Sequence, residues 1–255
     1  MTGNNVDTRI YTRLRQTALR SAEAVGPPSF YQNNQREFET SWESFRTNSS
    51  IKQCISYLDE AELYSGHGIP HAEAVALDAG TVIQIEGKSK NIGAELLKEL
   101  IVYVQIAAVF HDIKRKEKNH TVAGSNEAKR ILRDFGIDER YKQYIVDAIR
   151  NHEAFREVSE SPDIFAKLIS DSLYDADKFR WGPDNFTSTL WLMVEAADIS
   201  LYSLYERFTE NMKYIEKIKA TFRTETGRKY GPEFIDMGMA IGQAVYNEMS
   251  AIVLE

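Results

Sequence analysis

Apolar residues recur at helical spacing along most of the chain and are densest between residues 94 and 113. The stretch LIVYVQIAAVF, from Leu100 to Phe110, contains one strongly polar residue, Gln105. This pattern predicts a helix that is buried on most of its faces. The stretch has eleven residues, whereas a membrane-crossing helix needs roughly 20 apolar residues. We therefore expect a core helix and no membrane span.

In two later segments, the positions that form the apolar stripe of a predicted helix end in a polar residue. Ile145, Ile149 and His152 lie at i, i+4 and i+7, so His152 falls on the buried face of a helix. In DIFAKLISDSLYDADKFRW, apolar residues recur every four positions up to Asp177. Asp175 lies about 200° away around the same helix. The pattern predicts that Asp177, rather than Asp175, lies on the buried face.

The helical pattern is interrupted in four places. TVIQIEG, residues 81–87, alternates apolar and polar side chains and predicts a short hairpin or extended loop. Turn-forming residues cluster at 26–30, 66–70 and 181–185. These breaks predict a helical N-terminal extension (1–62), a middle part with the histidines (63–182) and C-terminal helices packed on it (183–255), together forming one compact unit.

Composition supports an all-α, multi-helix bundle, since 14 glycines and 6 prolines are few for 255 residues. The net charge of −7 argues against general nucleic-acid binding. Cys54 is the only cysteine, so no intramolecular disulfide forms, and the N-terminal residues lack the apolar segment of a secretory signal. We expect a cytoplasmic protein.

Candidate metal ligands gather in the middle of the sequence. His111 and Asp112 end the most apolar helix, where burying a carboxylate without a cation or donor costs several kcal/mol. A bound metal ion removes that cost. One histidine on an apolar face is more often a hydrogen-bonded core residue, so the inference rests on the set. All five histidines lie in this region: His67, His71, His111, His120 and His152.

At these residues the chain resembles the HD superfamily of metal-dependent phosphohydrolases. The resemblance covers residues 63–182 and rests on His71 in HAEAV, the doublet His111-Asp112 in AAVFHDIKR, and Asp177 in YDADKF. It implies an HD-domain-like helical core with these four residues as metal ligands. HEAFR stands where an HD-GYP phosphodiesterase would have its longer signature, which disfavours that subfamily.

Three further residues extend the resemblance. His120, in HTVAGSNEAKRIL, and His152, in VDAIRNHEAF, are similar to the later histidines of binuclear HD proteins, and Lys178 is similar to a phosphate-contacting lysine. Alternatively, the two histidines support the ligands or bind phosphate. With two ions, Asp112 would bridge them, His71, His111 and Asp177 holding one ion and His120 and His152 the other.

The resemblance implies hydrolysis of a small phosphorylated substrate, a phosphomonoester, phosphodiester or nucleotide, with one or two Mn, Mg, Fe, Zn or Ni ions per chain. Basic residues that could contact an anion crowd the motifs: Lys114, Arg115, Lys116, Lys118, Arg156 and Arg180. Two alternatives stay open. HD-type di-iron oxygenases use the same four histidines and two aspartates, and a regulatory module would bind a nucleotide without turnover.

Overall fold

The computed structural model describes residues 8–58, 66–158 and 160–254, and in these ranges it contains helices and turns but no strand. The all-α prediction is therefore confirmed. None of the helices in the described ranges is long and apolar enough to cross a membrane.

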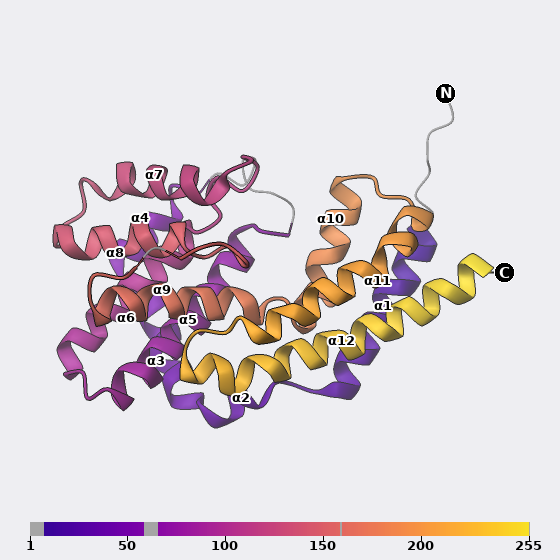
Figure 1. Cartoon of the computed structure of the whole chain (residues 1–255), viewed down its shortest axis with the longest axis horizontal. Coiled ribbons are helices and arrows are strands. Elements are labelled where there is room, and N and C mark those ends of the chain that lie inside the picture. The colour runs from indigo at the N-terminus through magenta and orange to yellow at the C-terminus, as the bar shows by residue number, and fades with distance from the viewer. Residues whose placement is uncertain (1–7, 59–65, 159, 255) are drawn as a thin grey trace.

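One half of the molecule is a helical bundle whose two central helices, α5 and α6, pack against each other and against α9 (Figure 1). On the outside, α8 packs on α6 and α9, α7 covers α8, and α3 and α4 lie against the central pair. The bundle helices are α3 (Gln35–Thr47), α4 (Ser49–Ile55), α5 (Ile69–Ser89), α6 (Ala94–Phe110), α7 (His120–Leu132), α8 (Glu139–Arg150) and α9 (Ile164–Phe179).

The other half joins the two ends of the sequence. Helices α1 and α11 both pack along α12 (Figure 1). Phe179, at the end of α9, stacks on Phe234 of α12 with ring centroids 4.2 Å apart, which ties this half to the bundle. Its elements are α1 (Thr8–Val25), α2 (Ser29–Asn33), the π-helical turn η1 (Asn185–Thr189), α10 (Leu190–Ala196), α11 (Leu201–Lys217), the 3₁₀ turn η2 (Ile218–Ala220) and α12 (Glu225–Leu254).

The prediction of a short hairpin or extended loop at residues 81–87 is wrong, because these residues belong to the last turns of α5. Neighbouring helices surround α5, so its polar side chains are buried together with the apolar ones. Gln84 donates hydrogen bonds to the carbonyl oxygens of Glu37 and Gly80, and Glu86 accepts from Thr226 of α12. The alternation of apolar and polar residues at 81–87 therefore comes from polar side chains that form hydrogen bonds inside the fold, and not from a strand with one face in water.

Helix α12 crosses the turn after α9 at very short range. A Cβ atom added at Gly238 would lie 2.8 Å from backbone atoms of Gly182, and backbone cannot move aside as a flexible side chain can. We expect Gly238→Ala to lower the free energy of unfolding by about 1–3 kcal/mol, the usual cost of overpacking. Urea denaturation measures this. The matched control is Gly136→Ala, where an added Cβ meets no atom within 4 Å; equal stability of the two variants would contradict the close approach.

Candidate metal centre

Four helix ends converge on one buried region. Helix α5 begins at Ile69, and Pro70 and His71 lie in its first turn. His111 and Asp112 directly follow α6, and both are buried. His152 lies just beyond α8, and Asp177 occupies the last turn of α9. Residues far apart in the sequence thus meet because the start of α5 and the ends of α6, α8 and α9 lie at the same end of the bundle.

His71, His111 and Asp177 form a first group that could hold a metal ion. The Nε2 atoms of His71 and His111 lie 3.2 Å apart, and Asp177 Oδ1 lies 3.5 Å and 3.7 Å from them. Two ligand atoms about 2.0–2.1 Å from one ion, at an angle of about 100°, lie about 3.2 Å apart. The spacing is therefore that of ligands sharing one ion.

A second group joins Asp112, His111 and His152. Asp112 Oδ2 lies 3.4 Å from His111 Nε2, and its Oδ1 lies 3.4 Å from His152 Nε2. Asp112 Oδ1 and His152 Nε2 are buried, and neither forms a hydrogen bond within the described part of the chain. Buried polar atoms almost always have a partner. A cation would satisfy both atoms, so these residues fit a metal ion.

The protonated nitrogen of two histidines is fixed by the backbone. His111 Nδ1 lies 2.7 Å from the carbonyl oxygen of Ala108, and His152 Nδ1 lies 2.6 Å from that of Ile149. A carbonyl oxygen can only accept, so each Nδ1 must carry a proton and donate it. Each Nε2 is then the ring nitrogen that faces the shared centre and can offer its lone pair to an ion, the orientation that backbone partners give to metal-binding histidines.

The charges around the centre favour ionised carboxylates. Burial alone would raise the pKa of Asp112, but His111 beside it holds that pKa well below its usual range. Burial also opposes ionisation of Asp177, and the Lys178 ammonium, 2.5 Å from Asp177 Oδ2, keeps its pKa well below the usual range. Burial lowers the pKa of His71. Anionic oxygens and a neutral imidazole are the protonation states that bind metal ions.

His120 lies at the edge of the centre. Its Nε2 is 3.8 Å from Asp112 Oδ1, and the Arg115 guanidinium contacts both, at 2.7 Å from His120 and 3.6 Å from Asp112. Burial and the nearby charge of Arg115 lower the pKa of His120 to about 4, so its ring is neutral. The structure thus brings five of the six expected ligands into the two groups and places the sixth next to Asp112 with Arg115 beside it.

The two aspartates near the end of α9 point to different partners. Asp177 lies in the first metal-binding group. Asp175 instead accepts hydrogen bonds from the backbone N–H groups of Arg223 and Thr224, both at 2.8 Å, and from the Thr224 hydroxyl. It therefore secures the segment that precedes α12. Lys178, expected to contact phosphate, is buried against Asp177 and lines a cavity beside the centre.

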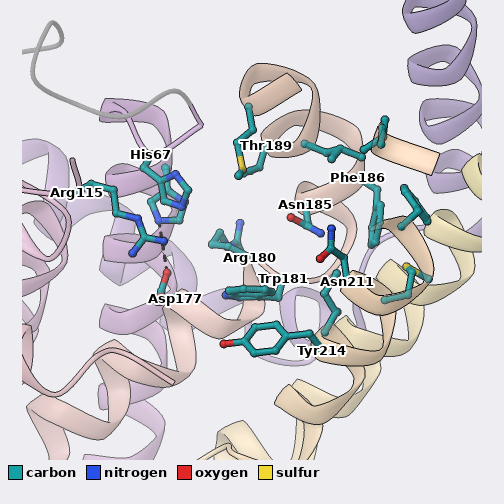
Figure 2. Close-up of a pocket in the computed structure, with 17 residues that line it drawn as sticks. His67, Arg115, Asp177, Arg180, Trp181, Asn185, Phe186, Thr189, Asn211 and Tyr214 are labelled. Carbon is teal, nitrogen blue, oxygen red and sulfur yellow. Dashed lines mark ion pairs between the residues drawn. The ribbon is translucent and has the colours of Figure 1, made fainter. Parts of the chain in front are cut away.

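Two cavities adjoin the centre. The polar cavity, about 440 Å³, is lined on the bundle side by Asp112, His120 and His152 together with Lys116 and Lys178. The apolar cavity, about 350 Å³, lies between the bundle and helices α10 and α11 (Figure 2). The two cavities share five lining residues: His67, Arg115, Asp177, Trp181 and Tyr214.

Sequence reasoning did not identify Trp181 and Tyr214 as site residues. Trp181 lies two residues after the end of α9, and Tyr214 lies on α11, outside residues 63–182. Their rings lie 5.7 Å apart at the boundary of both cavities (Figure 2). The local spacing of residues does not predict this contact between the two rings, because the contact depends on how α11 folds back over the bundle.

No family model, curated protein or solved structure matches the chain in the comparisons made with it. Its function is therefore inferred from the site.

Proposed function

We propose that the chain is a metal-dependent phosphohydrolase of the HD type that cleaves a small phosphate ester. One observation carries the proposal: Asp112 Oδ1 and His152 Nε2 are buried side by side, lack hydrogen-bond partners among the described residues, and adjoin the group formed by His71, His111 and Asp177. The order of these residues, His, His-Asp and Asp, is that of the HD superfamily, which supports hydrolysis as their use.

The bound ion would be held by His71, His111, Asp112 and Asp177. A divalent ion supplies Lewis acidity toward a phosphoryl oxygen and lowers the pKa of a coordinated water from 15.7 to about 7. Contacts within the chain already hold two of these ligands in place, because the Ala108 carbonyl orients His111 and Lys178 holds the Asp177 carboxylate. Such fixed supporting contacts typically contribute about 10–100-fold in metal affinity or activity.

The lining of the polar cavity suits a phosphate group. Arg115, Lys116 and Lys178 bring cationic side chains to it, beside the ligand residues Asp112 and Asp177. Charged hydrogen bonds to phosphate are among the strongest that proteins make. His67 lies at the boundary of both cavities, and burial lowers its pKa to about 4, so a neutral ring faces the substrate.

Hydrolysis is tested with p-nitrophenyl phosphate, bis-p-nitrophenyl phosphate and nucleotides, after metal removal by a chelator and re-addition of Mn, Mg, Fe, Zn or Ni. We expect activity to disappear with the metal and to return with at least one ion. Asp112→Ala should lose it, whereas Asp134→Ala, an exposed aspartate after α7, should keep it. Hydrolysis that survives both chelation and Asp112→Ala would rule out catalysis at this centre.

The second candidate is an iron-dependent oxygenase. It is favoured by the placement of Asp112, which offers one oxygen toward His111 and the other toward His152 and His120. A carboxylate facing two sets of imidazoles suits a pair of ions. Protein loaded with iron should then consume oxygen, and metal analysis should give about two ions per chain. Oxygen uptake without phosphate release would replace the hydrolase proposal.

A further inference from the structure

The apolar cavity opens directly beside the metal-binding residues. Figure 2 shows His67, Arg115 and Asp177 on one side and Asn185, Phe186 and Asn211 on the other. The far wall comes from η1, α10 and α11, and most of its side chains are apolar: Phe186, Leu190, Met193, Leu204, Phe208 and Met212. At about 350 Å³, its volume lies within the range of small-molecule sites.

The charges of the two cavities differ. Besides Arg115, the cationic lining residue of the apolar cavity is Arg180. The Arg180 guanidinium is bound to Asp78, to Asp184 at 2.5 Å and to the Tyr31 hydroxyl at 2.7 Å, so its charge is compensated within the fold. Away from the centre, the polar lining groups in the described chain are uncharged: Asn185, Thr189 and Asn211.

The polar cavity, in contrast, is lined by several charged side chains. Three cationic side chains line it, Arg115, Lys116 and Lys178, together with the carboxylates of Asp112, Glu153 and Asp177, and Asp177 also lines the apolar cavity. A substrate reacting at the centre can therefore place an anionic group on one side and an uncharged group on the other. A triphosphate chain would need cationic partners along its length, and the apolar cavity supplies them only at the end nearest the centre.

We infer that the substrate is an amphiphilic monoester, with its phosphate in the polar cavity and an uncharged, mainly apolar alkyl or aryl group in the apolar cavity. Asn185 and Asn211 provide hydrogen-bonding groups for a hydroxyl or carbonyl on that group. This inference rests on the proposed function, because the phosphate is assigned to the metal centre.

The test compares kcat/KM for methyl, butyl and hexyl phosphate, whose leaving groups have nearly the same chemistry. We expect an increase of about fourfold for each added methylene, the ratio that corresponds to about 0.8 kcal/mol of apolar burial. Met193→Trp, a half-buried cavity residue on α10, should abolish this dependence on chain length. Leu192→Trp is the matched control, since Leu192 is its exposed neighbour and does not line the cavity.

A binding measurement separates this inference from the proposed function. Trp181 lines the cavity, so 1-naphthol, which carries no phosphate, should change the tryptophan fluorescence of the wild type and bind at least about tenfold more weakly to Met193→Trp. Ester hydrolysis with no chain-length dependence and no naphthol binding would overturn the inference and leave the hydrolase intact. Naphthol binding that Met193→Trp blocks, without hydrolysis of any ester, would keep the apolar site and overturn the hydrolase.

Discussion

Asp177→Ala is expected to remove metal binding and to lower phosphate ester hydrolysis by more than about 100-fold. Residues that only support metal ligands contribute about 10–100-fold, and Asp177 offers its own oxygen within 3.7 Å of both His71 and His111. Metal analysis of the purified variant and its rate with p-nitrophenyl phosphate measure the two effects. Circular dichroism should show an unchanged helix content.

The matched variant is Asp175→Ala, two residues away on the same helix. Asp175 holds the backbone before α12, so its loss leaves buried N–H groups without an acceptor. We expect the free energy of unfolding to fall by about 1–3 kcal/mol, with metal content close to that of the wild type. If Asp177→Ala kept its metal and Asp175→Ala lost it, the placement of the centre would be wrong.

Asp78→Ala should be among the most destabilising substitutions in the chain, lowering the free energy of unfolding by about 3–5 kcal/mol. Asp78 and Arg180 form an ion pair whose side chains are 2% and 11% exposed. Burial lowers the pKa of Arg180, but Asp78 and Tyr31 raise it above its usual value, so the guanidinium stays charged. Without Asp78, a mostly buried positive charge loses its nearest partner.

Two controls isolate the buried charge. In Asp78→Ala combined with Arg180→Met, both charges are gone, so urea denaturation should show a smaller loss of stability than in Asp78→Ala alone. Glu95→Ala breaks an ion pair with Lys98 whose side chains are 87% and 69% exposed, and it should change stability by less than about 0.5 kcal/mol. If Glu95→Ala lowered the free energy of unfolding as much as Asp78→Ala, burial would not determine the cost of breaking an ion pair.

Local spacing accounts for much of the fold. Apolar residues at steps of three and four predicted the central helix around Leu100 to Phe110, and the structure has α6 there. The same spacing put His152 and Asp177 on buried faces, and both are buried, but Asp175, expected on the other side of the helix, is fully buried as well, because α12 and the segment before it cover that side of α9. It failed at residues 81–87, because Gln84 and Glu86 alternate with apolar neighbours although this part of α5 is buried or half-buried on every side. A spacing rule assumes that polar residues face water, and these two face hydrogen-bond partners instead.

The sequence by itself determined the helices and the residue types that could bind a metal, since both depend on interactions within a few positions of the chain. Only the tertiary structure decided which side chains meet. Arg180 pairs with Asp78, 102 positions earlier, and the wall of the apolar cavity comes from α10 and α11, which carry none of the recognised motifs. Contacts of this kind depend on the packing angles of whole helices, which no local pattern of residues encodes.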